Sequence, residues 1–323
     1  MNLDEIISPV KEEIRTFNRE FRTAIRSNVG IVDTIARYVL HQKGKKIRPI
    51  LVLLSAEASG GIAPSTYHAA TLVELLHTAT LIHDDVVDGA DTRRGLASIS
   101  AIWRNKVAVL MGDYLLSRGL LLSLFNDEFQ FLKLSSVAVK RMSEGELLQI
   151  QKAKQLDMNE ETYFRIISDK TASLISTCCE LGATSATKDG SVIKHMKTFG
   201  EYLGMAFQIR DDVLDYEGKT ATLGKPIGGD IRERKVTLPL IYAFEKAPKR
   251  TSKSVLKLLK NGKAGSKISE VIEFARNYGG IERAHKKAEE FVSSARDELK
   301  GIQESEAKTS LIKLTEFVVE RIS

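Results

Sequence analysis

Apolar residues recur every three to four positions along most of the chain, with almost no alternation of Val, Ile and Thr at period two. This spacing places apolar side chains on one face of a helix. Glycine-bearing breaks separate the periodic segments, and none of these breaks has the composition of an interdomain linker. We therefore expect an all-α fold in a single domain spanning residues 1–323, with helices over 31–40, 49–58, 67–87, 107–125, 132–150, 161–183 and 199–215.

Composition is that of an ordinary soluble globular protein, since 43% of the residues are hydrophobic and 28% are charged. The N-terminus carries acids early and lacks the basic and apolar segments of a signal peptide. No uninterrupted apolar stretch approaches the roughly 20 residues of a transmembrane helix. The two cysteines, Cys178 and Cys179, are adjacent and cannot join distant parts of the chain. We expect a cytoplasmic protein with no transmembrane segment.

A formal net charge of +6 raises the possibility of a nucleic-acid or membrane partner. Much of the excess lies between residues 246 and 267, which we interpret as a solvated helix face or loop. The other basic residues stand next to acidic clusters, and that mixture suits a metal-bridged anion better than DNA. We therefore expect no nucleic-acid partner.

Two acidic clusters with the same D-D-x-x-D spacing each end an apolar helix. Within each cluster the three carboxylates fall on one arc of an ideal helix, where they repel one another and oppose the negative end of the helix dipole. A cation would offset this charge, and carboxylate oxygens suit Mg²⁺, which keeps waters and substrate phosphates. One cluster alone could be a solvated helix end, but two identical clusters argue against that interpretation. The acids are Asp84, Asp85 and Asp88, then Asp211, Asp212 and Asp215, with Gln208 on the arc of the second cluster.

Two basic motifs accompany the acids. Arg93, Arg94 and Gly95 follow the first cluster, and Gly44 to Pro49 reads GKKIRP upstream of it. Arginine binds phosphate oxygens with two parallel hydrogen bonds, and lysine supplies a compact positive charge. Two such runs, one of them beside carboxylates, predict a diphosphate site.

Five separated motifs, taken together and in this order, resemble the trans-isoprenyl diphosphate synthases. The likeness is strongest to the long-chain polyprenyl diphosphate synthases, of the octaprenyl and heptaprenyl type, and it extends from Gly44 to Ser323. The motifs are GKKIRP, HTATLIHDDVVDGADTRRG, EGELLQIQ, DKTASLI and FQIRDDVLDYEG, the last followed by GKPIGGDIRERKVTLPL.

The resemblance implies a helical bundle of the isoprenoid synthase type with a central active-site cavity, acting as a homodimer. It implies a prenyltransferase that joins isopentenyl diphosphate to an allylic diphosphate with Mg²⁺ bound by the six acids. Lys170, Lys225 and Arg93 would contact the allylic diphosphate, and Thr171 and Gln208 would border the reacting carbons. Isopentenyl diphosphate would bind Lys45, Arg48, His77 and Arg94. Lys235 is also expected to bind substrate.

Product length should depend on Ala79 and Thr80, which precede the first acidic cluster on the same helix. Short-chain members of the family tend to place aromatic rings there as a floor. Two small side chains imply a product of about 30 to 50 carbons in a buried apolar channel. Close packing between helices would also explain these residues. The allylic primer and the pathway that uses the product stay open.

Three other functions would each explain part of this pattern. A terpene cyclase shares the fold and the first acidic cluster, yet such enzymes usually replace the second with an Asn-Ser/Thr-Glu pattern. A non-catalytic subunit of a heteromeric synthase would be expected to have lost acids, and none of the six is missing. A nucleic-acid-binding helical protein would leave the aligned carboxylates unexplained, because they repel phosphate without metal.

Overall fold

Helices make up nearly all of the described chain in the computed structural model, which describes residues 3–42, 44–93, 95–156, 158–217, 227–260 and 267–319. The N-terminal half comprises α1 (Leu3–Ile6), the 3₁₀-helix η1 (Ser8–Val10), α2 (Lys11–Ala24), α3 (Gly30–His41), α4 (Ile47–Ala58), α5 (Pro64–Val87), α6 (Ile99–Phe125) and α7 (Phe129–Gln155). A short antiparallel pair, β1 (Thr92–Arg93) and β2 (Leu96–Ala97), lies between α5 and α6.

The second half begins with α8 (Glu160–Ile167), the π-helical turn η2 (Ser168–Ala172), α9 (Ser173–Ala186) and α10 (Gly190–Glu217). It continues with α12 (Gly229–Arg232), α13 (Leu238–Lys246), α14 (Lys249–Lys260), α15 (Ile268–Asn277), α16 (Gly280–Leu299) and α17 (Glu306–Val319). The predicted all-α fold is confirmed. One predicted helix, over 161–183, is divided by η2 into α8 and α9.

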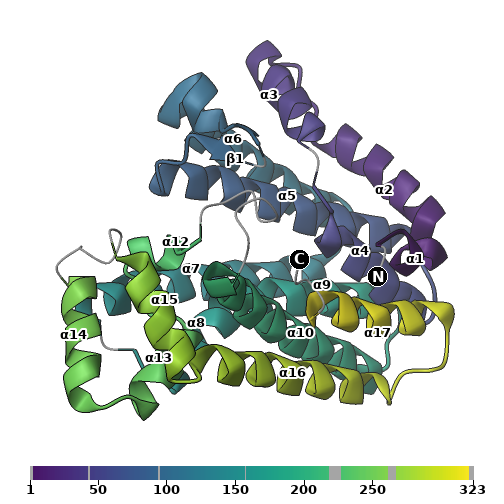
Figure 1. Cartoon of the computed structure of the whole chain (residues 1–323). Helices are drawn as coiled ribbons and strands as arrows, with labels where there is room; N and C mark the ends of the chain where they lie inside the picture. Colours follow the sequence, from purple (N-terminus) through teal and green to yellow (C-terminus); the bar gives the residue numbers. More distant parts are fainter. Residues whose placement is uncertain are drawn as a thin grey trace.

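Two groups of buried apolar residues hold the helices together. The larger one includes residues of α4, α5, α9 and α10, and the smaller one includes residues of α8, α10, α13, α15 and α16. Helix α10 contributes to both, so it connects the two parts of the core. Figure 1 shows α5 and α10 in the middle of the molecule, with α12 to α15 gathered on the side away from α2 and α3.

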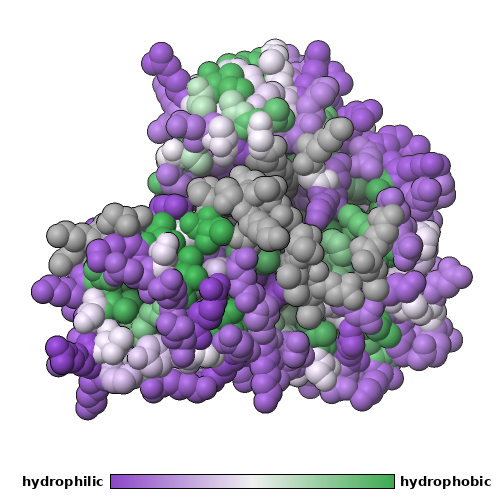
Figure 2. All heavy atoms as spheres, viewed as in Figure 1, coloured by the Kyte–Doolittle hydropathy of each residue, from purple (hydrophilic) through white to green (hydrophobic). Residues whose placement is uncertain are grey.

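The basic stretch that begins near residue 246 is partly described. Helix α14 buries Val255 and Leu259 and leaves Lys249, Lys253 and Lys257 exposed, which confirms a solvated face over this helix. Figure 2 shows hydrophilic residues along the lower left edge of the molecule, where α14 lies. Residues 261–266 lie outside the described chain. Cys178 and Cys179 are buried free thiols, and burial raises the pKa of Cys179 to about 12.

Helix α6 is more apolar over its length than expected, because the sequence showed no stretch that approached a transmembrane helix. Among the described helices it is long and apolar enough to cross a membrane, a test that core helices of soluble proteins also pass. It packs along α5 through Gly119, where an added Cβ would lie 3.1 Å from Leu72. Its other side, with the adjoining surface of α7, exposes large apolar side chains. They include Leu110, Leu124, Phe125, Phe129, Val137 and Leu147.

Candidate active site

The first acidic cluster ends α5, but its carboxylates have different surroundings. Asp85 is only 3% exposed and accepts a hydrogen bond from Arg93 Nε of β1 at 2.6 Å. Asp84 and Asp88 are exposed. Partial burial, followed by the negative charges of Glu146 and Asp88, raises the pKa of Asp84 above its usual range. The positive charges of Lys170 and Arg93 oppose this effect without cancelling it, so this part of the site carries excess negative charge.

The second cluster ends α10 and is more buried than the first. Asp212 is 5% exposed, and its carboxylate accepts hydrogen bonds from Tyr163 Oη at 2.6 Å and Gln208 Nε2 at 2.7 Å. Asp211 is exposed. The Asp215 carboxylate accepts the backbone N–H groups of Gly229 at 2.9 Å and of the next residue at 3.0 Å, so it holds the start of α12 beside α10.

Helix α12 brings another acid, Asp230, next to the second cluster. Burial raises the pKa of Asp230 to about 6, with the negative charge of Asp215 the next cause. Burial also raises the pKa of Asp212 well above its usual range, and Asp230 is the largest electrostatic cause after it. Lys235 opposes this charge, because it lowers the pKa of Asp230. The sequence did not single out Asp230, although it lies within the GKPIGGDIRERK motif.

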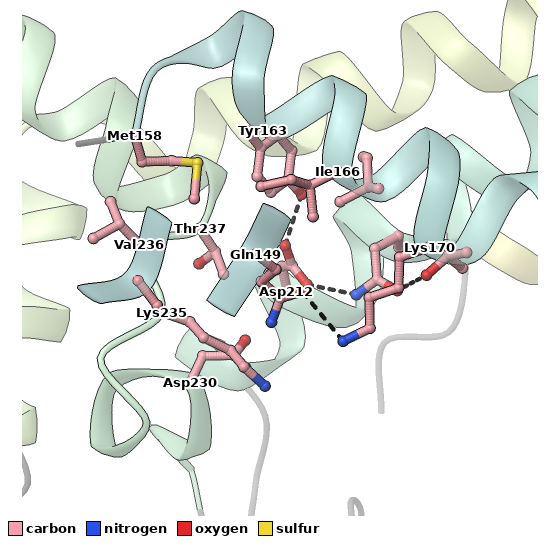
Figure 3. Close-up of a pocket in the computed structure, with 14 residues that line it drawn as sticks. Gln149, Met158, Tyr163, Ile166, Lys170, Asp212, Asp230, Lys235, Val236 and Thr237 are labelled. Atoms are coloured by element: carbon pink, nitrogen blue, oxygen red, sulfur yellow. Dashed lines mark hydrogen bonds between the residues drawn. The ribbon is translucent and has the colours of Figure 1, made fainter. Parts of the chain in front are cut away.

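The π-helical turn η2 presents Lys170 and Thr171 to a cavity of about 80 Å³. Lys170 Nζ donates to Gln149 Oε1 at 3.1 Å and lies 2.5 Å from Glu146 Oε2. Thr171 Oγ1 donates to Gln208 Oε1 at 2.7 Å. Thr171 and Gln208 line the same cavity. Figure 3 shows Lys170 and Gln149 around it with Tyr163, Asp212, Asp230 and Lys235. Residues from η2, α10 and the segment after α12 therefore line one cavity.

Glu146 on α7 links the two acidic clusters, and the sequence analysis missed it. Its charge acts on Asp84 of the first cluster, and it also raises the pKa of Lys235, which acts on Asp230 beside the second cluster. The two clusters thus share charged neighbours although they are far apart in the chain. Its position inside the EGELLQIQ motif was the available signal. Tyr163, also missed, carries no motif of its own.

A second cavity, of about 390 Å³, contains three of the residues assigned to isopentenyl diphosphate. Lys45, Arg48 and His77 all line it, and Arg48 Nη1 donates to His77 Nε2 at 2.9 Å. Lys45 Nζ lies 5.2 Å from the centre of the Phe317 ring. The lining also includes the buried acid Glu74 and several apolar side chains, among them Leu51, Ile175, Leu203, Phe207 and Leu314. The cavity therefore combines cationic groups with a surface that suits hydrocarbon.

Four predicted residues need separate mention. Arg94 and Lys225 lie outside the described residues. Ala79 is 1% exposed within the larger core, and Thr80 Oγ1 donates to the His77 carbonyl at 2.9 Å. Neither Ala79 nor Thr80 lines the two cavities described above.

The acids fit a hard divalent cation that shares its ligands with a substrate. In the described part of the chain, no three His, Cys, Asp or Glu side chains are grouped so as to hold a metal by themselves. Mg²⁺ commonly binds proteins through one or two carboxylates and completes its shell with waters and phosphates. Burial is the largest cause of the raised pKa values of Asp84, Asp212 and Asp230, and neighbouring acids raise them further, so a cation beside these carboxylates would be stabilised.

Comparisons with known proteins agree with this geometry. Residues 29–275 match the polyprenyl synthetase family. The chain is 36% identical over 321 residues to the all-trans-nonaprenyl-diphosphate synthase (geranyl-diphosphate specific) of Rhodobacter capsulatus, covering 98% of each chain. It is 33% identical over 321 residues to the short chain isoprenyl diphosphate synthase of Methanothermobacter thermautotrophicus, covering 97% of this chain and 98% of that one.

A solved structure shares the whole fold. The polyprenyl synthase from Caulobacter crescentus CB15, complexed with calcium and isoprenyl diphosphate, superposes with a TM-score of 0.92 at 31% identity, covering 100% of this chain and 98% of that one. The all-α fold and its paired acidic helices define an enzyme that transfers prenyl groups. The chain belongs to the polyprenyl synthetase family. The resemblance noted in the sequence is confirmed.

Proposed function

We propose that this enzyme, a single catalytic domain over residues 1–323, adds isopentenyl diphosphate repeatedly to an allylic diphosphate, head to tail and in trans geometry. The observation that carries the proposal is a pair of separate anion sites. One lies between the acidic clusters of α5 and α10, because the charge of Lys170 acts on Asp84 of the first cluster while its side chain lines the same cavity as Asp212 of the second. The other is the cavity lined by Lys45, Arg48 and His77.

The allylic diphosphate belongs in the acidic site. Asp84, Asp85, Asp88, Asp211, Asp212 and Asp215 are the proposed ligands of several Mg²⁺ ions, which when bound supply Lewis acidity to the leaving diphosphate. Lys170 and Lys235 offer ammonium groups to the same diphosphate, joined by Arg93 and Lys225. Asp84 and Asp211 are best placed for direct binding because their side chains are exposed, whereas Asp85 is buried and accepts from Arg93.

Isopentenyl diphosphate belongs in the basic cavity. Arg48 can bind two phosphate oxygens through its guanidinium, while Lys45 adds a compact charge. The hydrogen bond between Arg48 and His77 orients that guanidinium toward the cavity. Arg94 completes the set in our proposal. The apolar side chains that also line this cavity suit the five-carbon tail and limit access of water.

The reaction then proceeds by ionisation, condensation and elimination. The bond between carbon and the diphosphate oxygen breaks, and the allylic fragment becomes a cation. The double bond of isopentenyl diphosphate attacks this cation, forming a carbon–carbon bond, and a proton leaves to the released diphosphate. Thr171 and Gln208 border the reacting carbons. The hydrogen bonds from Thr171 to Gln208 and from Gln208 to Asp212 fix the orientation of the Thr171 hydroxyl and the Gln208 amide there.

Product length is proposed to depend on Ala79 and Thr80. Relatives at 36% and 33% identity bear names for long and short products, so overall identity does not decide the length. Ala79 is a small side chain in the core of α5, and the Thr80 hydroxyl is bonded to its own helix. Neither side chain provides an aromatic floor, which favours products of about 30 to 50 carbons in an apolar channel.

A homodimer is the proposed assembly. The exposed apolar side chains of α6 and α7, among them Leu110, Phe125, Phe129 and Leu147, form a surface that a second copy would bury. The same surface accounts for the hydropathy of α6 without a membrane crossing. The two buried free thiols favour a reducing compartment, and we therefore propose a cytoplasmic location.

Radiolabelled isopentenyl diphosphate tests the proposal. Purified enzyme with Mg²⁺ and geranyl or farnesyl diphosphate should transfer label into an extractable lipid diphosphate, with one inorganic diphosphate released for each addition. Release of diphosphate from the allylic substrate alone, at the same rate and with no label incorporated, would instead indicate a cyclase or a hydrolase. A chelator should abolish incorporation, and added Mg²⁺ should restore it.

A further inference from the structure

The turn that carries Lys170 and Thr171 is a π-helix, and its other side meets an ion network that the proposed chemistry does not use. In η2 the Ser173 backbone N–H bonds to the carbonyl of Ser168, five residues earlier. Such turns contain one residue more than the regular helix and occur frequently at functional sites. Something must hold the extra residue in place, because an uninterrupted α-helix is the usual alternative.

One guanidinium contacts this turn from the neighbouring helix α7. Arg141 Nε donates to Asp169 Oδ1 at 2.8 Å, and Arg141 Nη2 donates to Ser168 Oγ at 2.8 Å. Ser168 and Asp169 are the two residues of η2 immediately before Lys170. Arg141 therefore binds the first half of the turn, while the second half presents Lys170 and Thr171 to the cavity.

The same guanidinium also reaches α10. Arg141 Nη2 donates to Glu201 Oε1 at 3.0 Å, and Ser168 Oγ donates to that same carboxylate. The side chains of Arg141, Asp169 and Glu201 are 31%, 21% and 25% exposed, so solvent screens them only in part. A single side chain thus ties η2 to both helices that flank it.

Two glycines show how closely these helices pack on the turn. Gly145 lies one helical turn after Arg141, and a Cβ there would stand 2.8 Å from the Lys170 backbone nitrogen. Gly204 follows Glu201 by three residues, and a Cβ there would stand 2.5 Å from the Ala172 Cα. The backbone of η2 therefore fits between α7 and α10 with no spare room. A shift of the turn would move Lys170 and Thr171 directly.

We propose that Arg141, through Asp169, Ser168 and Glu201, is a positioning residue that holds the π-helical turn and so aims Lys170 and Thr171 at the allylic diphosphate. This inference rests on the proposed role of Lys170. An ordinary surface ion pair would contribute little to the stability of the fold and would leave catalysis unchanged. A positioning role predicts instead a loss on the allylic side of the reaction, because small displacements of catalytic groups are costly.

The test is steady-state kinetics on Arg141→Met. We expect kcat to fall by about 10- to 100-fold, as for a misplaced catalytic group. The KM for the allylic diphosphate should rise by about three- to tenfold through the weakened Lys170 contact, with the KM for isopentenyl diphosphate within about twofold of wild type. Arg141→Lys, which keeps the charge but loses the planar fork, should recover part of kcat.

Lys197→Met is the matched control. Lys197 Nζ lies 3.1 Å from Glu180 Oε2 and joins α10 to α9, so its loss breaks an ion pair between neighbouring helices without touching η2. We expect the control to retain wild-type kcat and both KM values. Asp169→Asn, which keeps the shape of the side chain, should reproduce the Arg141→Met pattern and decides the matter if Arg141→Met does not fold.

Failure of this inference can be told apart from failure of the proposed function. If Arg141→Met or Asp169→Asn matches Lys197→Met in kcat and in both KM values, Arg141 does not position the turn. The same conclusion follows if the KM values for both substrates rise equally. Lys170→Ala is measured in parallel. A full loss of activity in Lys170→Ala with normal Arg141→Met would overturn only the positioning role, whereas normal Lys170→Ala would overturn the proposed function of Lys170 itself.

Discussion

Arg48 and His77 are joined by a hydrogen bond of 2.9 Å that crosses from the first turn of α4 to the middle of α5. Both residues line the larger cavity, and His77 is 9% exposed. A guanidinium can only donate, so His77 Nε2 is the acceptor in this hydrogen bond. The pair fixes a cationic group at the cavity wall before any substrate arrives.

Arg48→Ala should weaken isopentenyl diphosphate binding selectively. Loss of a charge-assisted phosphate contact should raise the KM for this substrate by about 10- to 100-fold, and the KM for the allylic substrate by much less. Arg94→Ala is predicted to act in the same direction. Steady-state kinetics with each substrate varied in turn measures both effects. Equal changes in the two KM values would count against separate anion sites.

Asp84→Ala and Asp211→Ala should each lower turnover by several orders of magnitude, because each removes a proposed metal ligand. The Asp84 variant should remain folded, and its melting temperature should rise slightly, since the mutation relieves repulsion with Glu146 and Asp88. Differential scanning fluorimetry and turnover in Mg²⁺ measure the two effects. Normal turnover by Asp211→Ala would contradict a metal clamp formed by both clusters.

Asp230→Asn should stabilise the protein at neutral pH. The pKa of Asp230 is about 6 in the folded chain and 3.8 ordinarily, so the folded state binds more protons between these values. The contribution of protonated Asp230 to the free energy of unfolding is therefore fully present below about pH 4 and is lost as the pH rises toward 6. The variant should gain about 1 to 3 kcal/mol in the free energy of unfolding at pH 7.5.

The same gain should shrink at pH 4.5, where Asp230 in the wild type is largely protonated. Urea unfolding at both pH values, without Mg²⁺, measures the difference. Asp297→Asn is the control, because Asp297 is a surface acid whose side chain is 60% exposed. An Asp230→Asn gain that is equal at both pH values would show that ionisation is not its cause.

Ala79→Tyr or Thr80→Phe should shorten the main product to about 15 or 20 carbons, with activity largely retained, because a ring there would block the growing tail. Each added isoprene unit buries about five carbons in the channel, which contributes at most about 3 to 4 kcal/mol to the binding free energy of the product. Thr80→Ser is the control and should leave the length unchanged. Products of unchanged length from both folded ring-bearing variants would place the floor elsewhere.

Much of the fold and the site could be predicted from the sequence because the signals are local. The apolar periodicity predicted α5 and α10, and the D-D-x-x-D spacing located the acids at their ends. The identical spacing of the two clusters did not reveal that Asp85 is bound by Arg93 while Asp84 stays exposed. Such differences depend on which neighbouring element packs against each carboxylate, and helical spacing carries no information about that.

Long-range partners account for most of what was missed. The π-helical turn η2 lies inside a segment whose periodicity predicted one continuous helix, because a single extra residue barely changes the pattern over many turns. Asp230 and Tyr163 reach Asp212 from other helices, and although Asp230 lies within a motif, no spacing in the sequence relates either residue to Asp212. Arg141 likewise resembles a surface arginine until its contacts with Asp169 and Glu201 are seen.

Repeated condensation of isopentenyl diphosphate onto an allylic primer is tested most directly by the mass of the product. Purified enzyme is incubated with Mg²⁺, geranyl or farnesyl diphosphate and excess isopentenyl diphosphate, and the dephosphorylated lipid is analysed by mass spectrometry. We predict a series of linear alcohols spaced by one five-carbon unit and ending at about 30 to 50 carbons. A cyclised hydrocarbon, or recovery of the primer with no five-carbon addition, would contradict this chemistry.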